Sequence, residues 1–383
     1  MNRRMLVGLS LLLATGSLFA LLLAIPTRST ASGVERVEAQ IAPANWYSVT
    51  VDSAGEVGGY SSLALDSSDN PNISYCDSTN GTVKYAWLSG DTWYSTTVDS
   101  VAGLASICRS TSLALDSSDN PCIAYHHHDD NSLKYAWLSG TVWYSTTVDN
   151  SVDGVGWFAS LALDSNDSPH IGYYDNVNDA LKYAWLSGTV WYSITVDSSS
   201  DVGWHTSLAL DSSDNPHISY HDNTNDALKY AWLSGTVWYS TTVDSSESTG
   251  LYTSLALDSN NLPHISYSGS NRPMKYAWLS GTVWHVTTVD THGMYTSLAL
   301  DGSDNPYISY YNNAGSDLRI AWLSEATWMD APVDTAGTVG LYTSLALDSR
   351  GDLHISYHAG EGYGDLKYAR RSPYQIYLPL ILK

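Results

Sequence analysis

Short segments in which apolar and polar residues alternate recur along this chain. The string S-L-A-L-D occurs seven times, and segments of the types P-H-I-S-Y, L-K-Y-A-W and W-x-x-x-T-V-D follow it in each copy except the last, which lacks the final segment. These segments are rich in Tyr, Trp, Thr, Val and Ile, are bounded by turn residues and show no helical periodicity, so they predict β-strands. The S-L-A-L-D strings end at Asp66, Asp116, Asp164, Asp211, Asp258, Asp301 and Asp348.

The repeat predicts an all-β, seven-bladed β-propeller with four antiparallel strands per blade. Its spacing of 43 to 50 residues is typical of propellers and solenoids. Links within a copy are hairpin-sized, whereas the link from each T-V-D to the next S-L-A-L is longer, so S-L-A-L-D is the innermost strand and W-x-x-x-T-V-D the outermost. The last copy stops after Tyr368 and Ala369. We expect residues 46–52 (WYSVTVD) to supply its outer strand and close the seventh blade.

The same strand order divides the loops between two faces of the propeller. One face, called the plain face here, carries nearly unvarying turns of the D-S-S-D-N-P and L-S-G-T types. The other, the variable face, carries the links between blades and the loops after H-I-S-Y, where the copies differ. Residues that are the same in all copies are those that each blade needs to fold. Positions that differ between copies are those at which a blade can take on a specific role. We therefore expect a binding site on the variable face.

The N-terminal segment predicts export from the cytoplasm. A basic start at residues 2–4 precedes an uncharged apolar run over residues 5–25, which is typical of a signal peptide. The run is also long enough to span a bilayer, so an uncleaved anchor is the alternative and the one expected membrane contact. We predict a signal peptide or anchor at 1–31, a linker at 32–45, the propeller at 46–371 and an apolar tail at 372–383. The expected protein is a secreted or cell-surface monomer.

The charge of the chain excludes one class of partner. Lys and Arg total 17 against 39 Asp and Glu, a formal net charge of -22. Proteins bind nucleic acid by replacing condensed counterions with Lys and Arg, and this acidic chain offers few of either. Nucleic acid is therefore not an expected partner. The expected partner is a glycan or an extracellular protein.

Aromatic residues are concentrated on the variable face. Thirteen of the 15 Trp occupy repeated strand positions, whereas Trp157 and Trp204 lie in the loops that lead into the third and fourth blades. The residue three before the first Leu of each S-L-A-L carries a ring in six of seven copies, with Ser110 in the seventh, which predicts a ring of side chains at the channel mouth. Aromatic faces suit the C–H side of sugars and the edges of peptides. The predicted ligand-binding residues are Tyr60, Trp157, Phe158, Trp204, His205, Tyr252, Tyr295 and Tyr342.

These aromatic positions have alternative interpretations. The rings can serve only to wedge neighbouring blades apart, because large aromatic side chains usually stabilise a fold by burial. Period-two alternation also places Trp157 and Trp204 on the strand face that carries the core Leu residues. The two Trp are therefore either exposed stacking platforms or buried plugs.

The sequence predicts no metal, no cofactor and no catalytic residue. Short Asp and Asn side chains in the repeated D-S-S-D-N turns satisfy the backbone, which we favour over calcium binding. The loops at 175–179 and 222–226 have enough oxygen atoms for calcium but lack the Gly and distal Glu of an EF-hand, so calcium there stays an alternative. The run from His126 to Asp130 offers transition-metal ligands, but consecutive side chains point in different directions, and a solvated loop is favoured.

Three further residue types have structural interpretations. Cys76 and Cys108 fall on the variable face and Cys122 on the plain face, so a disulfide, if one forms outside the cell, is expected between the first two. The Lys of L-K-Y-A-W is expected to pair with a neighbouring Asp. The His of P-H-I-S-Y repeats at equivalent positions, which indicates a packing or turn residue rather than a catalytic group.

The repeat over residues 46–371 resembles those of secreted bacterial propellers of the broad sialidase-like and seven-bladed lectin type. The sialidase Asp-box, S-x-D-x-G-x-x-W, is absent, so the resemblance extends to architecture more than to a defined activity. The end of the chain, residues 374–383 (YQIYLPLILK), is similar to a short L-P-L terminus on exported proteins of Chloroflexi-like bacteria. This resemblance implies a surface-sorting role, and packing of an apolar tail on the propeller is the alternative.

Two classes of function follow. The favoured one is an extracellular, non-catalytic binding protein whose carbohydrate or protein ligand occupies the variable face. The alternative is a hydrolase or lyase that acts on polysaccharide. Hydrolysis of a glycoside needs two carboxyl groups at a fixed separation. Candidate acids on the variable face are Asp129, Asp153, Asp201 and Glu361.

Overall fold

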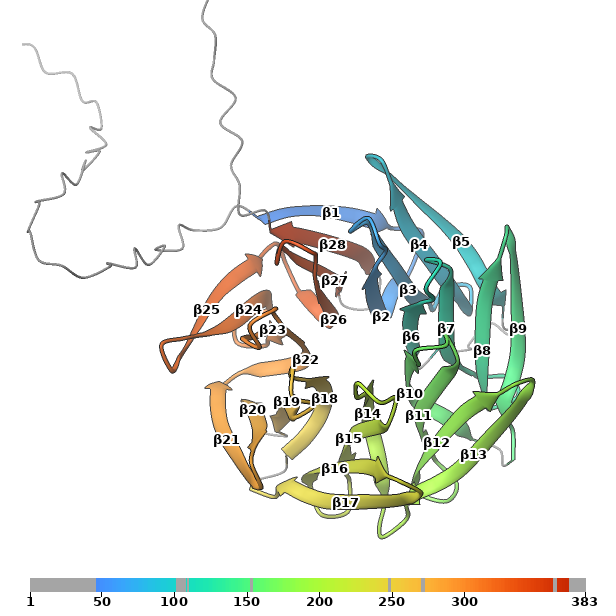
Figure 1. Ribbon diagram of the computed structural model, residues 1–383. Helices are drawn as coiled ribbons and strands as arrows, with labels where there is room; N and C mark the ends of the chain where they lie inside the picture. Colours follow the sequence, from blue (N-terminus) through green and yellow to red (C-terminus); the bar gives the residue numbers. More distant parts are fainter. Residues whose placement is uncertain are drawn as a thin grey trace, which may run out of the picture. The chain divides into compact units, whose positions relative to one another are not determined.

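The computed structural model describes residues 46–100, 108, 110–151, 154–246, 249–269, 273–360 and 364–371. These residues form 28 strands in seven four-stranded antiparallel sheets, which stand as blades around a central axis (Figure 1). The predicted seven-bladed β-propeller is confirmed. Within the described ranges, no helix is long and apolar enough to cross a membrane. The segments predicted as signal, linker and tail, at 1–31, 32–45 and 372–383, lie outside the described residues.

Each blade runs from an inner strand at the axis to an outer strand at the rim, and blades 1 to 7 are numbered by their inner strands. The inner strands are β2 (Val57–Leu65), β6 (Thr111–Leu115), β10 (Val155–Leu163), β14 (Val202–Leu210), β18 (Thr249–Leu257), β22 (Gly293–Leu300) and β26 (Val339–Leu347). The second strands are β3 (Pro71–Asp77), β7 (Pro121–His127), β11 (Pro169–Asp175), β15 (Pro216–Asp222), β19 (Pro263–Gly269), β23 (Pro306–Asn312) and β27 (Leu353–Ala359). The third strands are β4 (Thr82–Ser89), β8 (Ser132–Ser139), β12 (Ala180–Ser187), β16 (Ala227–Ser234), β20 (Met274–Ser280), β24 (Asp317–Ser324) and β28 (Asp365–Arg371). The outer strands are β5 (Thr92–Ser100), β9 (Val142–Asp149), β13 (Val190–Asp197), β17 (Val237–Asp244), β21 (Val283–Asp290), β25 (Thr327–Asp334) and, for blade 7, β1 (Trp46–Asp52).

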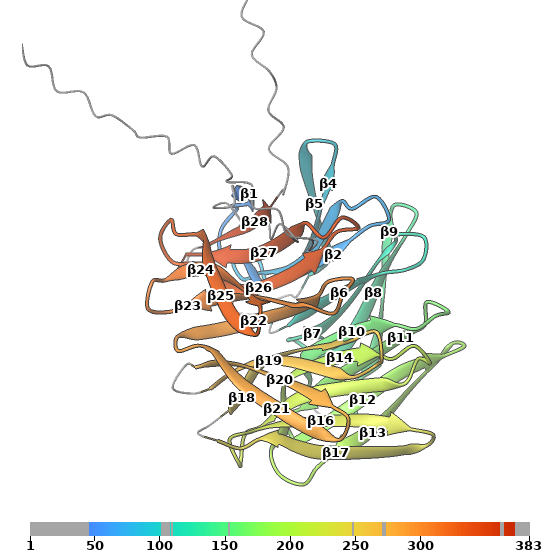
Figure 2. The same ribbon diagram turned by 60° about the vertical axis from the view of Figure 1, so that its left-hand side comes forward.

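The first strand of the chain closes the ring as predicted. β1 pairs antiparallel with β28, so that Trp46 lies opposite Arg371 and Val49 opposite Tyr368. Figures 1 and 2 both show β1 beside β28, with β27 and β26 following toward the axis. The start of the propeller therefore completes its last blade, and β28 has no unpaired edge.

The hydrophobic core lies between neighbouring blades. In the cluster between blades 1 and 2, Val83 and Tyr85 of β4 pack with Ile123 and Tyr125 of β7, and all four side chains are buried. The second strands β3 and β7 are buried at every position. Burial on both faces explains why these strands carry Ile and Tyr so regularly.

A polar network ties each blade to the next near the variable face. Asp52, at the end of β1, accepts a hydrogen bond from the Tyr75 hydroxyl of blade 1 at 2.7 Å and forms an ion pair with Lys84 of the same blade. The expected pairing of the repeated Lys with an Asp is confirmed. Further ion pairs are Lys134–Asp99, Lys182–Asp149, Lys229–Asp197, Lys275–Asp244 and Lys367–Asp334, and in blade 6 Arg319 pairs instead with Asp317 and Asp330.

The repeated D-S-S-D-N turns join the blades on the plain face. Within the first turn, the Asp66 carboxylate accepts hydrogen bonds from the backbone amides of Ser68 and Asn70, which confirms the interpretation of these acids as turn residues. Across the interface, Ser67 donates to Asp119 of blade 2 through both its amide and its hydroxyl, at 2.9 and 2.6 Å. Equivalent contacts join Ser117 to Asp167, Ser165 to Asp214, Ser212 to Asn261, Ser259 to Asp304 and Ser349 to Asp69.

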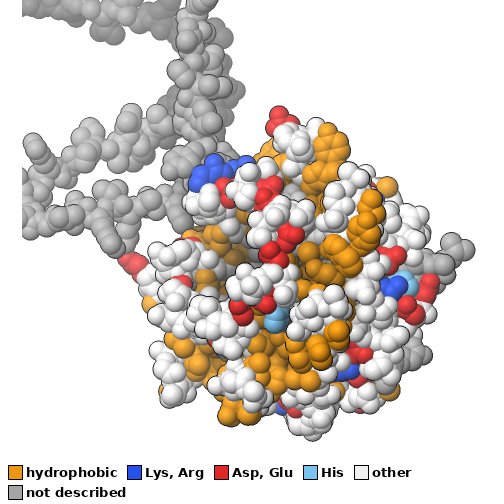
Figure 3. Space-filling view, turned by 45° about the vertical axis from the view of Figure 1, so that its right-hand side comes forward, with side chains coloured by type: hydrophobic (Ala, Val, Ile, Leu, Met, Phe, Trp, Pro, Cys, Tyr) orange, Lys and Arg blue, Asp and Glu red, His pale blue; other side chains and the backbone are white. Residues whose placement is uncertain are grey.

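The outer strands present aromatic side chains at the rim of the propeller. On the face drawn in Figure 3, acidic side chains are spread among polar and apolar ones, and basic side chains are sparse. In blades 1 to 4, a half-exposed Tyr of the outer strand stacks on the Trp two residues before the end of the third strand. These rim residues are Tyr94, Tyr144, Tyr192 and Tyr239.

The inner strands begin earlier than the S-L-A-L-D pattern predicts. β10 begins at Val155 and β14 at Val202, so Trp157 and Trp204 are strand residues, and their predicted placement in loops is wrong. The pairing register shifts between Val155 and Trp157 and again between Trp157 and Ser160. Such bulges interrupt period-two alternation. Counting by alternation from the core Leu residues therefore does not determine where the two Trp side chains point.

Candidate ligand-binding cavity

A cavity of about 430 Å³ lies where the seven inner strands meet at the axis. All seven ring positions predicted around the channel line it, and so does Trp204, whereas Trp157 is not among the lining residues. The structure thus brings together seven of the eight predicted ligand-binding residues. The lining residues are Tyr60, Ser110, Phe158, His205, Tyr252, Tyr295 and Tyr342, the small residue after each of them, and Trp204.

The six ring-bearing positions share an unusual backbone conformation. Their φ angles lie between 50° and 53°, in the left-handed region that residues with bulky side chains rarely adopt. The described Ser110, at the seventh position, does not have a positive φ. Residues held in this region cost about 1 to 3 kcal/mol each and tend to occur at functional sites. The strain therefore accompanies the rings, which lie at Tyr60, Phe158, His205, Tyr252, Tyr295 and Tyr342.

The six rings form an open circle around the cavity. Successive ring centroids are 4.3 to 4.7 Å apart from Tyr60 through Tyr342, Tyr295, Tyr252 and His205 to Phe158, with planes tilted by 38° to 58°. The circle is interrupted where Ser110 stands between Phe158 and Tyr60. Because each ring is half-buried, it packs against its neighbours and also presents surface to the cavity. The wedge and the binding interpretations are therefore compatible.

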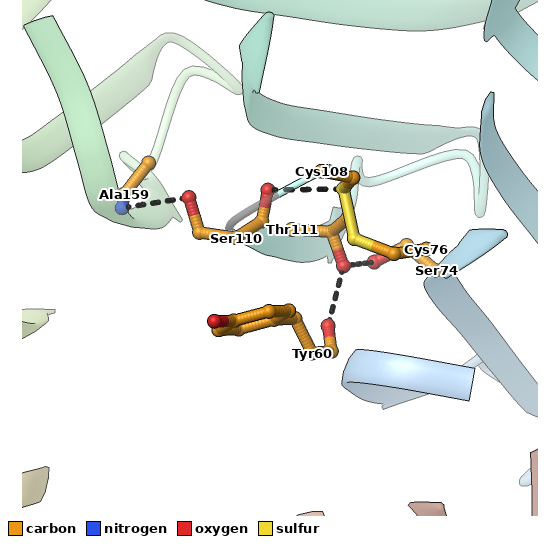
Figure 4. The surroundings of a disulfide bond; sticks show 7 residues. All are labelled: Tyr60, Ser74, Cys76, Cys108, Ser110, Thr111 and Ala159. Carbon is orange, nitrogen blue, oxygen red and sulfur yellow. Dashed lines mark hydrogen bonds between the residues drawn. A yellow bond between two sulfur atoms is a disulfide. The ribbon is translucent and has the colours of Figure 1, made fainter. Parts of the chain in front are cut away.

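Hydroxyl groups of the following blade hold the strained backbone. The Thr111 hydroxyl donates to the Tyr60 carbonyl at 2.8 Å, and the Thr253 hydroxyl donates to the His205 carbonyl at 2.7 Å. Figure 4 shows the first of these contacts, with the Tyr60 ring extending away from the strands. Two further contacts of this kind are Thr296 to the Tyr252 carbonyl and Ser61 to the Tyr342 carbonyl.

A disulfide lies beside the gap in the circle. Cys76 of β3 and Cys108 are bonded, with Cα atoms 5.6 Å apart, as the sequence predicted (Figure 4). Cys108 is two residues before Ser110, so the bond fixes the chain that enters blade 2.

The cavity wall is uncharged near neutral pH. Burial raises the pKa of the Tyr252 hydroxyl, and the neighbouring Tyr295 adds to this effect. Burial lowers the pKa of His205 to about 3, with repulsion from His221 as a second cause. The described lining residues include no Asp or Glu. The wall therefore offers apolar ring surface and neutral hydroxyl groups, which suit a ligand without charge.

A hydrogen-bond cluster positions Trp204 at the cavity. Its Nε1–H donates to Asp201 at 2.7 Å, and the same carboxylate accepts from the Tyr174 hydroxyl and from the Asn223 side chain, each at 2.7 Å. Tyr174 also contacts the Trp204 ring, with centroids 5.3 Å apart. The sequence did not assign this positioning role to Asp201, because its donors come from three separate segments.

The other residues with predicted chemistry take different positions. Trp157 packs against His126 and Tyr174 instead of lining the cavity. Asp129 is exposed in the loop after β7. Two further candidate acids, Asp153 and Glu361, lie outside the described residues.

The loops considered for calcium form tight turns. Asp175 accepts hydrogen bonds from two backbone amides and from the Asn178 side chain, and Asp222 accepts from the amide and side chain of Asn225. Donors inside the loop thus occupy both carboxylates. In the part of the chain that the structure describes, no group of three or more His, Cys, Asp or Glu side chains could hold a metal ion.

Comparison with known proteins identifies the fold. No protein-family model and no curated protein matches the sequence. Among solved structures, the chain is similar to the Aleuria aurantia lectin bound to Fucα1-6GlcNAc, with a TM-score of 0.52 and 14% identity over 75% of this chain and 98% of that one. It is also similar to the SapL1 lectin bound to α-methyl fucoside (0.50, 12%, over 74% and 97%) and to the polysaccharide lyase Uly1 (0.53, 10%, over 82% and 89%). At such identities the likeness shows the propeller fold alone.

Proposed function

We propose that this protein is an extracytoplasmic, non-catalytic lectin that holds a neutral glycan in the axial cavity. The observation that carries the proposal is the circle of six rings, each in a strained backbone conformation, around a cavity of about 430 Å³. Left-handed φ angles are costly for residues with bulky side chains, yet they recur at all six ring positions. The repeated strain is accounted for if it aims the rings at a ligand.

The chemistry of the wall favours a sugar over other small ligands. Aromatic faces cover the C–H side of a sugar ring, and neutral hydroxyl groups exchange hydrogen bonds with sugar hydroxyls. The wall has no charge with which to hold an anion or a cation. The two lectins with similar folds bind fucosides, and this supports a glycan as the ligand class without indicating which sugar.

A glycan array tests the proposal directly. We expect the exported protein to bind a defined set of neutral glycans. In Tyr295→Asn and Tyr252→Asn, binding should weaken at least about tenfold, because residues at the centre of an interface contribute most of the affinity. Asn tolerates the left-handed conformation, so these variants remove a ring without adding backbone strain.

The control is a Tyr of the same type at the rim. Tyr239 is half-exposed on β17, away from the axis, so Tyr239→Asn should bind like the native protein. The proposal is wrong if the folded protein binds no glycan on the array. It is also wrong if the two cavity variants bind as well as the rim variant does.

A further inference from the structure

A histidine fills the same place in four of the seven blades. It is the second residue of the second strand, and its Nδ1 shares a hydrogen bond with the Tyr hydroxyl of the third strand. Its Nε2 lies 3.5 to 3.7 Å from the Asp that follows the inner strand. The predicted packing role of this His is thus confirmed. The four sets are His170 with Tyr183 and Asp164, His217 with Tyr230 and Asp211, His264 with Tyr276 and Asp258, and His354 with Tyr368 and Asp348.

Blade 2 keeps the partners of this histidine but not the histidine itself. Cys122 occupies the position, while Tyr135 stands where the other blades have the hydroxyl and Asp116 where they have the carboxylate. A cysteine side chain ends at the atom where the imidazole ring of a histidine begins. The Cys122 sulfur takes the place of the first ring carbon, and no atom of residue 122 fills the volume that the other four ring atoms take up in four other blades.

A cavity of about 440 Å³ is present at this place, between blades 2 and 3 on the plain face. Blade 2 contributes the buried Cys122, and Trp191 of blade 3 meets the Tyr135 ring edge-on, with centroids 5.5 Å apart. Asp167 of blade 3 brings a second carboxylate to the wall. Other lining residues include Trp137, Leu138, Leu186 and Pro169.

We propose that this cavity binds a small molecule that carries an imidazole or a similar protonated nitrogen heterocycle. The Tyr135 hydroxyl and the Asp116 carboxylate correspond to the two groups that contact the imidazole nitrogens in the other blades. The negative charge of Asp116 and Asp167 favours a protonated ring, and the aromatic and aliphatic side chains surround its edges. Burial raises the pKa of the Cys122 thiol to about 11, so the floor of the cavity stays neutral.

Imidazole itself is the first probe. We expect imidazole at millimolar concentration to raise the melting temperature of the native protein and to show saturation transfer from it in NMR. Thiazole has the same ring size and aromaticity but lacks an N–H donor and stays unprotonated near neutral pH. It should bind at least about tenfold more weakly, which corresponds to the loss of a single strong polar contact.

Three variants separate the proposed site from a non-specific effect. Cys122→His places in the cavity the imidazole ring that four other blades carry at this position. It should therefore raise the melting temperature and abolish imidazole binding. Cys122→Ala removes the sulfur that stands where the first ring carbon of a histidine would lie, so it enlarges the cavity and should bind imidazole at least as tightly as the native protein. His170→Cys opens the equivalent place in blade 3, and imidazole should restore part of the stability that this variant loses.

Each possible result decides the matter. Binding of imidazole to the native protein and to Cys122→Ala but not to Cys122→His supports the proposal. It is overturned if Cys122→His binds imidazole as well as the native protein does, if thiazole binds equally tightly, or if the native protein binds no imidazole. These measurements do not involve the axial cavity, so their outcome is independent of glycan binding.

Discussion

Ser349 of blade 7 donates its hydroxyl hydrogen to Asp69 of blade 1 at 2.6 Å, although 280 positions separate them in the chain. The same contact joins successive blades around the plain face, and the interface of blades 6 and 7 differs. There, Gly302 stands in place of the Ser and Gly351 in place of the Asp. Both partners of one contact are thus missing together, which leaves the interface next to the closing blade without this connection.

Restoring this contact should stabilise the protein. In Gly302→Ser combined with Gly351→Asp, we expect a gain of about 1 kcal/mol in the free energy of unfolding from the new hydrogen bonds. Gly351 has a φ of 81°, and Asp69 shows that an Asp tolerates a similar angle of 64° in its own turn. Denaturation of both single variants and the double variant measures the coupling between the sites. Strictly additive effects would show that no contact forms.

Acid should weaken the polar network between blades. Burial alone raises the pKa of Asp197, but hydrogen bonds from Lys229 and Tyr220 outweigh it and lower the pKa to about 2. A carboxyl with a pKa below its unfolded value stabilises the fold above that unfolded value, about 3.9, and loses this contribution as the pH falls toward 2. The contribution of Asp197 at neutral pH is on the order of 2 kcal/mol.

The variant Asp197→Asn tests this pH dependence. It leaves the buried Lys229 without its anionic partner, so at pH 7 it should unfold more easily than the native protein. The difference in free energy of unfolding should shrink between pH 4 and pH 2, because native Asp197 becomes protonated in that range. A difference that stays constant down to pH 2 would rule out the proposed linkage.

Removal of the closing strand should cost most of the stability. Without Trp46–Asp52, β28 becomes an unpaired edge, and Tyr75 and Lys84 lose their shared acceptor. We expect a melting temperature lowered by more than about 10 °C, together with aggregation during size-exclusion chromatography. Asp52→Asn keeps the strand and removes only the charge, so it should fall between the native and the shortened proteins. An unchanged melting temperature of the shortened protein would mean that the ring does not depend on β1.

The architecture could be predicted from the sequence because the strand pattern of one blade occurs seven times. The seven S-L-A-L-D strings and the orphan strand at the N-terminus determined the blade number and the closure. The six ring positions at the cavity could also be predicted from the sequence. Each lies three residues before the first Leu of its inner strand, so equivalent residues are at the same level along the axis. In a repeat protein, the position of a residue in one blade predicts the positions of the equivalent residues in all the other blades.

Other features depend on contacts that no local pattern contains. The bulges around Trp157 and Trp204 shift the register by amounts that alternation cannot reveal, so the sequence left open where these two side chains point. The contact of Ser67 with Asp119 joins residues 52 positions apart, and each of them by itself fits an ordinary turn. The cavity at Cys122 becomes apparent only after the His170 environment shows what normally fills the space.

The two unusual Trp residues provide the most specific test of the axial site. Trp204 lines the axial cavity and packs against Phe158, with ring centroids 5.5 Å apart. Trp157 packs away from the cavity against His126. Because both side chains are half-buried, Trp204→Ala and Trp157→Ala should each lower the free energy of unfolding by about 1 to 3 kcal/mol. Only Trp204→Ala should also weaken glycan binding, by about tenfold, when affinity is measured at a temperature where both variants are folded. Trp204→Phe keeps most of the apolar surface but loses the hydrogen bond to Asp201, so an intermediate affinity is expected. Equal losses of affinity in the two Ala variants would mean that stability alone limits binding, and full affinity in Trp204→Ala would place the glycan elsewhere.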